Sequence, residues 1–221
     1  MEFDYRYTEY IERLGLLPFV NMVSRSSVWM NPCALTALVD RWRPETHTFH
    51  LGCGEMTVTL QDVSMILALP ISGQPLCFST DSKDWRESMR SLIGCAPVYP
   101  GMTAGAPYTW IALRYGKCPE NATEETVQQH ARAFVWYVIS RTLFADSGGN
   151  NAAWMWLKAL TSWDSKISWG SAALAYLYRQ VILYAQLVVM IQTCNLNVIF
   201  TCMFSICRWM RRVVGHRLKL V

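Results

Sequence analysis

The chain has 221 residues, of which 52% are hydrophobic and 16% charged, and its formal net charge is +4. This length allows one domain with a substantial core. The ten tryptophans must be buried in that core or against a partner, and this composition excludes a disordered chain. The body of the chain is close to neutral and offers no general field for nucleic acid, because five basic residues lie near the C-terminus. They are Arg208, Arg211, Arg212, Arg217 and Lys219.

The eight cysteines include no C-x-x-C pair, and the first ten residues, MEFDYRYTEY, do not have the pattern of a signal peptide. Reduced thiols in a nuclear or cytoplasmic protein are the simplest interpretation.

In the first third of the chain, residues 2–14 have helical spacing, and Gly15 and Pro18 end that predicted helix near Leu14. Asn31-Pro32 begins a second helix, which stops before Pro44. Residues 46–51 and 55–59 then form two strands of a hairpin with its turn at 52–54. Thr59 caps the next helix, with Asp62 as its capping-box partner, and Pro70 and Gly73 end it.

Further along, the pattern predicts short helices at 84–93 and 110–115, separated by a loop rich in glycine and proline at 95–107. Asn121 or Thr123 caps a long helix that runs to about residue 144, and helical segments follow at 152–160 and 168–184. The fold class is therefore mainly α with one short β-hairpin.

Residues 181–207 form a run without any charged residue, and this run is long enough to cross a bilayer. Arg208, Arg211 and Arg212 follow this run, as cytoplasmic flanks of membrane spans do. Gln186, Gln192, Asn195 and Asn197 interrupt the run. Two core helices with a turn at 193–195 are the alternative, and we favour that alternative over a membrane span.

His47, His50 and Cys53 have a spacing that metal sites use, and Cys33 is a further candidate ligand. On a strand, however, His47 and His50 point to opposite faces. We therefore predict a packed hairpin and no metal.

A two-metal nuclease would need clustered carboxylates in the same block. The candidates are Asp40, Glu45, Glu55 and Asp62. We expect Arg41, Arg43 and the capping role of Asp62 to account for most of this charge.

Arg41-Trp42-Arg43 is the most informative polar cluster in the sequence. Arginine beside tryptophan can stack on bases or bind phosphate. The arginines can equally clamp Glu45 or Glu55 across the hairpin, and we favour the clamp because the body of the chain is nearly neutral. A second group of tryptophans is predicted to be core rather than a ligand cage. Its members are Trp154, Trp156, Trp163 and Trp169.

The segment LVDRWRPETHTFHLGCGEMTVTLQDVSMILALPISGQP resembles the plant mobile domain of maintenance-of-meristems-like proteins, also called aminotransferase-like. The resemblance continues through DWRES, CPENATEETVQQHARAFVWYVISRTLFADSGGN, WMWL and WGSAALAYLYRQ. Gly52 departs from it, since the family usually has proline there, and so does the apolar segment after Gln180. The resemblance implies a plant protein, some members being nuclear and linked to meristem maintenance, transposon silencing or mobile elements.

The resemblance implies no catalytic residue. None of the five lysines has the sequence context of a Schiff-base lysine, so we predict no enzyme activity and no cofactor. The lysines are Lys83, Lys117, Lys158, Lys166 and Lys219.

We expect a helix and linker at 1–30, a truncated N-terminal part of the plant mobile domain at 31–180, and a divergent apolar segment with a basic tail at 181–221. The first functional hypothesis is a nuclear interaction module that acts through protein partners. The second is a nucleic-acid-binding remnant of a mobile element, using Arg41, Trp42, Arg43, Arg208, Arg211 and Arg212. The third is a membrane-associated product through 181–207.

The turn Cys53-Gly54-Glu55 is predicted to serve folding rather than chemistry. Gly54→Val should therefore unfold the domain, which a thermal melting curve would show. A variant that melts like the wild type but loses its activity would instead make this turn a functional site.

Overall fold

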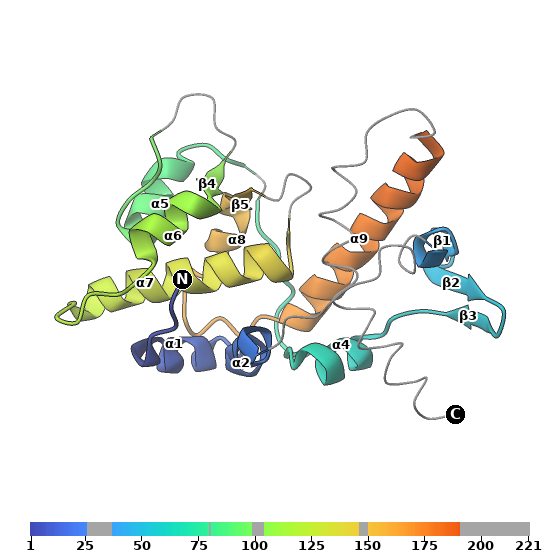
Figure 1. Cartoon of the computed structure of the whole chain (residues 1–221), viewed down its shortest axis with the longest axis horizontal. Coiled ribbons are helices and arrows are strands. Elements are labelled where there is room, and N and C mark those ends of the chain that lie inside the picture. The colour runs from blue at the N-terminus through green and yellow to red at the C-terminus, as the bar shows by residue number, and fades with distance from the viewer. Residues whose placement is uncertain (26–36, 80, 99–103, 146–149, 191–221) are drawn as a thin grey trace.

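The structure is a computed structural model of the chain, and it describes residues 1–25, 37–79, 81–98, 104–145 and 150–190. Two groups of elements lie side by side (Figure 1). One group surrounds the long helix α7 (Glu124–Thr142), and the other consists of a three-stranded sheet with helices α4 (Leu60–Leu67) and α9 (Trp169–Met190).

The 3-10 helix η1 (Tyr5–Tyr7) and the helix α1 (Thr8–Arg13) pack against α7, and the helix α2 (Leu17–Arg25) packs against α1. The predicted helix at 2–14 is confirmed as η1 and α1. Helix α2 differs from the sequence prediction, in which Pro18 ends the first helix. Proline is tolerated in the first turn of a helix, where the missing N–H has no intrahelical acceptor.

The predicted hairpin is confirmed as β2 (Thr48–Leu51) and β3 (Gly54–Met56), and β1 (Trp42–Arg43) pairs antiparallel with β2. The prediction that Trp42 lies on a helix is wrong, because it is paired with Phe49 across the sheet. Pro44 disfavours helical backbone at Arg43, and the pairing buries the Trp42 indole.

Helix α4 (Leu60–Leu67) begins with the predicted capping box. The Thr59 hydroxyl accepts from the Asp62 N–H, and the Asp62 carboxylate accepts from the Thr59 N–H. The helix ends at Leu67, before the predicted stop at Pro70, because Ala68 has left-handed backbone with φ 52°.

The remaining elements surround α7 (Glu124–Thr142), whose predicted cap is confirmed as Thr123. They are α5 (Trp85–Ile93), α6 (Tyr108–Tyr115), α8 (Trp154–Lys158), β4 (Gly105–Pro107) and β5 (Asn151–Ala153). Strands β4 and β5 pair antiparallel, so the predictions of loop at 105–107 and of helix at 152–153 are wrong. Gly105 allows this pairing, because a Cβ there would lie 2.3 Å from the Ala152 carbonyl oxygen.

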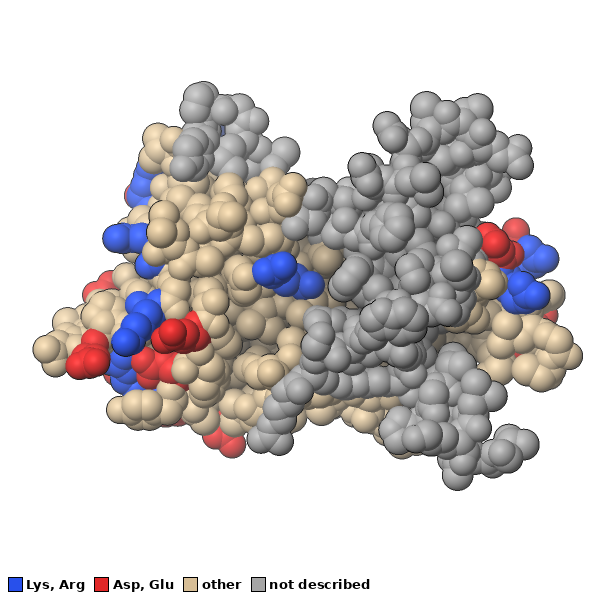
Figure 2. Space-filling view, in the orientation of Figure 1, with Lys and Arg blue, Asp and Glu red and all other residues tan. Residues whose placement is uncertain are grey.

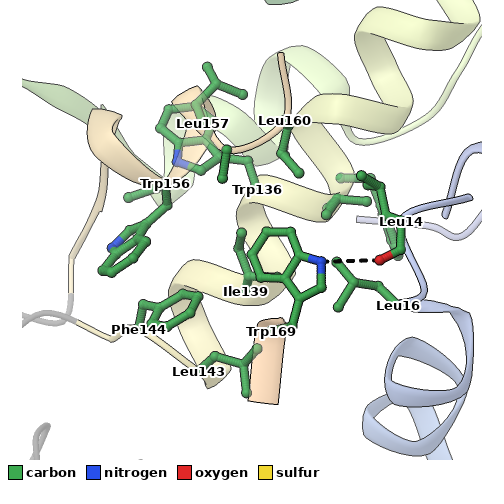
Figure 3. Close-up of a cluster of buried hydrophobic side chains, with 14 of the residues drawn as sticks. Leu14, Leu16, Trp136, Ile139, Leu143, Phe144, Trp156, Leu157, Leu160 and Trp169 are labelled. Carbon is green, nitrogen blue, oxygen red and sulfur yellow. Dashed lines mark hydrogen bonds between the residues drawn. The ribbon is translucent and has the colours of Figure 1, made fainter. Parts of the chain in front are cut away.

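The core is centred on α7 and contains the tryptophans predicted to be buried (Figure 3). Trp136 and Trp169 are fully buried, and the rings of Phe144 and Trp156 stack with centroids 3.9 Å apart. Trp154, Trp156, Trp163 and Trp169 are each no more than 9% exposed, so their prediction as core residues is confirmed. The Trp169 indole N–H donates to the Leu14 carbonyl oxygen at 3.1 Å.

Helix α9 (Trp169–Met190) begins where two distant segments cross. The Gly170 N–H donates to the Pro70 carbonyl at 2.8 Å, and the Gln74 N–H donates to the Lys166 carbonyl at 2.7 Å. The backbones come this close because Gly73 and Gly170 have no side chains. A Cβ on Gly73 would lie 2.3 Å from the Lys166 carbonyl oxygen, and a Cβ on Gly170 would lie 2.6 Å from the Ile71 side chain.

Within the described part of the chain, no helix combines the length and the apolar character that a membrane span requires. Most of the predicted apolar segment, and with it the alternative turn at 193–195, lies outside the described residues.

The crossing predicts that Gly73→Ala is destabilising. Gly73 has φ 118°, a conformation that alanine avoids, and its new methyl group would collide with a backbone carbonyl. We expect a loss of about 2–4 kcal/mol in the free energy of unfolding, measured by urea denaturation. Gly52→Ala is the matched control, since a Cβ there meets nothing within 4 Å. Equal stability of the two variants would contradict the close approach.

Candidate interaction surface on the hairpin

The inner face of the hairpin sheet packs on α9 through aromatic rings. The Trp42 ring centroid lies 4.8 Å from that of Phe49 and 5.5 Å from that of Tyr178 on α9. The Tyr178 hydroxyl donates to the Val58 carbonyl at 2.5 Å and lies 3.0 Å from the Thr57 hydroxyl. Tyr178 on α9 therefore contacts both the sheet and the segment that follows β3. The outer face of the sheet remains in solvent.

Trp42 is 3% exposed, and its indole N–H has no acceptor among the described residues. Its ring is therefore unavailable for stacking on bases, and this part of the Arg41-Trp42-Arg43 hypothesis is wrong. Arg41 and Arg43 are exposed on the solvent side.

The predicted clamp is also wrong. Among the described residues, neither arginine forms an ion pair with Glu45 or Glu55. The Glu55 carboxylate instead accepts from the Thr48 hydroxyl at 3.0 Å and is 2.7 Å from the His50 ring nitrogen Nε2. The strand register explains this, because His50 lies directly opposite Glu55 while Arg43 lies on the far strand. The hydrogen bond from Thr48, followed by that from His50, lowers the pKa of Glu55.

These contacts form a polar row across the outer face. The Thr46 and Thr48 hydroxyls are 2.6 Å apart, and Thr48 and His50 both contact Glu55. All four groups are accessible, so water competes with each pair and the row contributes little to stability. Its chemistry is suited to recognition by hydrogen bonds and charge.

His47 and His50 point to opposite faces, as predicted. The His47 ring packs 5.5 Å from the Tyr178 ring on the inner side, whereas His50 pairs with Glu55 on the outer side. His47 also has left-handed backbone, with φ 54°. Among the described residues no three His, Cys, Asp or Glu side chains are grouped as a metal site requires, and Cys33 lies outside them.

Gly52 and Cys53 form the tip of the hairpin, and Gly54 and Glu55 of the predicted turn are the first residues of β3. Gly54 has φ 121°, and a Cβ on it would meet nothing within 4 Å. Valine at this position would therefore act through backbone strain alone, and the effect of Gly54→Val stays a prediction.

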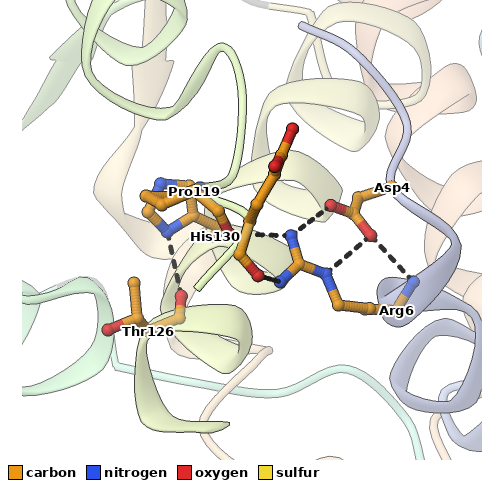
Figure 4. A network of polar contacts seen from close by, with 6 residues as sticks. Asp4, Arg6, Pro119, Thr126 and His130 are labelled. Atoms are coloured by element: carbon orange, nitrogen blue, oxygen red, sulfur yellow. Dashed lines mark hydrogen bonds and ion pairs between the residues drawn. The ribbon is translucent and has the colours of Figure 1, made fainter. Parts of the chain in front are cut away.

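A second polar network fastens the N-terminus to the loop before α7 (Figure 4). The Arg6 guanidinium pairs with Asp4 at 2.6 Å and donates to the carbonyls of Pro119 and Glu120. The hydrogen bond from Arg6 lowers the pKa of Asp4. His130 lies beside this network and contacts the Thr126 carbonyl oxygen at 2.9 Å. The network positions the chain and presents no reactive group.

Arg132 joins α7 to α5 and to the turn after α8 in a similar way. Its guanidinium donates to the Leu92 and Leu160 carbonyls and lies 4.8 Å from the centroid of the Trp163 ring. Burial lowers the pKa of Arg132. Arg6, Arg132 and Tyr178 were not singled out from the sequence, because no local motif marks a side chain whose partners are carbonyls more than a dozen residues away.

Among the described residues that are visible in Figure 2, acidic and basic side chains are intermixed at both ends of the face. The described part of this face therefore has no extended surface of one sign. Arg208, Arg211 and Arg212 lie outside the described residues.

The family model described as plant mobile domain matches residues 17–206, which include the hairpin, α4 and all of α9. The chain belongs to the plant mobile domain family.

Three Arabidopsis thaliana proteins illustrate the relationship. Protein MAINTENANCE OF MERISTEMS is 36% identical over 160 residues, which are 70% of this chain and 33% of that protein. Protein MAIN-LIKE 2 is 36% identical over 174 residues, which are 77% of this chain and 26% of that protein. A serine/threonine-protein phosphatase 7 long form homolog is 40% identical over 150 residues, which are 66% of this chain and 11% of that protein.

This plant mobile domain thus spans about a third or less of the length of these relatives. No solved structure matches it.

The docking of the hairpin on the plant mobile domain predicts that Tyr178→Phe loosens the sheet. The variant leaves the Val58 carbonyl without its donor, at a cost of about 1–3 kcal/mol. Hydrogen exchange should accelerate in β1–β3 more than in α7. Tyr5→Phe is the control, since Tyr5 is 81% exposed. Unchanged exchange in the sheet of Tyr178→Phe would contradict this docking.

Proposed function

We propose that this plant mobile domain is a non-enzymatic nuclear interaction module that acts through protein partners in meristem maintenance and transposon silencing. The name of one relative, MAINTENANCE OF MERISTEMS, supports the developmental part of the proposal. The silencing part and the nuclear location rest on the family resemblance of the sequence.

The observation that carries the proposal is the recurrence of one region in relatives with different names. The matched region makes up 33% of MAINTENANCE OF MERISTEMS and 11% of the phosphatase 7 homolog. A segment that recurs as a small part of differently named proteins behaves as a module, and binding is a property that such a module can carry between them.

The geometry supports binding rather than chemistry. The aromatic side chains that a ligand cage would use, including Trp42 and Trp169, are buried in the core. The polar row of Thr46, Thr48, His50 and Glu55 lies instead on the solvent face of a sheet. An ion or hydrogen bond there is exposed to water, which suits recognition of a partner better than stabilisation of a transition state.

Affinity purification from plant nuclei tests the proposal. The tagged full chain should capture a reproducible set of proteins, and Thr48→Ala with His50→Ala should reduce that capture because both changes lie on the outer face. The matched control is Ser88→Ala with Ser91→Ala, two exposed positions on α5. Capture no greater than that of the tag alone would contradict a role as a protein-interaction module.

Nucleic-acid binding is the second candidate, favoured by the exposed Arg43, which makes no ion pair with any described residue. Duplex DNA binding that weakens steeply with salt and is lost in Arg208→Gln with Arg211→Gln and Arg212→Gln would support it. Absence of binding at low salt would rule it out.

A further inference from the structure

The outer edge of β3 has main-chain hydrogen-bonding groups that no other described segment uses. In a strand, the N–H and C=O of alternate residues point to opposite sides. The His50 N–H donates to the Arg41 carbonyl at 2.8 Å, so the main-chain groups of His50 point toward β1. Those of its neighbours Phe49 and Leu51 therefore point toward β3, where they meet Met56 and Gly54.

Glu55 lies between Gly54 and Met56, so its N–H and C=O point away from β2, toward the open edge. Thr57, two residues on, has no main-chain hydrogen bond to any other described residue. Within the described residues β3 is the last strand of its sheet, and the β2–β3 hairpin projects from the end of the molecule (Figure 1). Thr57 follows the end of β3 and its hydroxyl contacts Tyr178 on the inner side, so the alternation that places the main-chain groups of Glu55 at the open edge does not extend to Thr57.

The side chains along this edge define what would fit beside it. The Glu55 side chain is 49% exposed on the outer face, and its hydrogen bonds to Thr48 and His50 fix its carboxylate in place. A lysine or arginine directly opposite Glu55 would be favourable, because side chains paired across strands lie within contact distance. On the inner face the neighbour is Met56, which is half-buried and would pair with an apolar residue.

We propose that the edge of β3 is a β-augmentation site for an extended peptide in which a basic residue alternates with apolar ones. This inference rests on the proposed function, since it names the surface through which the module would take a protein partner. The added strand would bond to the N–H and C=O groups of Glu55, and the Glu55 carboxylate would select the basic residue. So short an edge gives weak binding on its own.

The probe is a capped nine-residue peptide of alternating valine and threonine with a central lysine, titrated into the 15N-labelled full chain. The control peptide has glutamate in place of the lysine. We expect the lysine peptide to shift the amide signals of Glu55 and its neighbours and to slow the hydrogen exchange of Glu55 at least tenfold. Shifts that map to another surface, no shift at millimolar peptide, or equal binding of the two peptides would overturn the proposal.

Two variants sharpen this test. Glu55→Pro removes an N–H that makes no bond within the sheet, so the melting temperature should change little while peptide binding is lost. Glu55→Gln keeps that N–H and loses the charge, so it should bind both peptides alike and the lysine peptide several-fold more weakly than the wild type does. Unaltered peptide binding by either variant overturns the proposal. If Glu55→Pro fails to fold, peptide binding by Glu55→Gln decides the test.

The nuclear purification separates this inference from the proposed function. If folded Glu55→Pro captures the same proteins as the wild type, the edge is not the docking site and the proposed function stands. If the wild type captures nothing, the proposed function falls, whatever the peptide does.

Discussion

The crossing of residues 69–74 with residues 166–170 is the contact on which the rest of the structure depends. Three main-chain hydrogen bonds join the segments: Gly170 to Pro70, Gln74 to Lys166, and Ser168 to Gln74. Trp169 lies within this crossing, fully buried, and its indole N–H reaches the Leu14 carbonyl. The contact thus joins the N-terminal helices, the segment after α4 and the start of α9, which are far apart in the sequence.

The position of the hairpin follows from this contact. Because the crossing fixes where α9 begins, it also fixes Tyr178 on α9, and Tyr178 holds Trp42, Thr57 and Val58. The inner face of the sheet is buried as a result, and the outer face and the edge of β3 remain open. The surface that we assign to partner binding is therefore placed by main-chain hydrogen bonds at the crossing, by aromatic packing, and by the hydrogen bonds of Trp169 and Tyr178.

The sequence predicted those features whose cause is local. The capping box at Thr59 and Asp62, the Thr123 cap and the turn between β2 and β3 each depend on residues close together in the chain, and each is found. Strands β1, β4 and β5 were missed, because each is defined by pairing with another segment, and for β4 and β5 that segment is more than 40 residues away. The arginine clamp failed for a similar reason, since only the register shows that His50, and not Arg43, lies opposite Glu55. The family resemblance depends on an ordered series of motifs along the sequence. The proposed binding edge depends on which main-chain groups are unbonded, and only the strand pairing shows this.

The central claim is that the crossing makes one cooperative unit of the hairpin and the helices around α7. Native-state hydrogen exchange of Trp169→Phe tests it most directly, because this variant leaves the buried Leu14 carbonyl without its donor, at a cost of about 1–3 kcal/mol. The account predicts that amides in β2 and in α7 lose protection by the same free energy. Loss of protection in α7 with unchanged protection in β2 would contradict it.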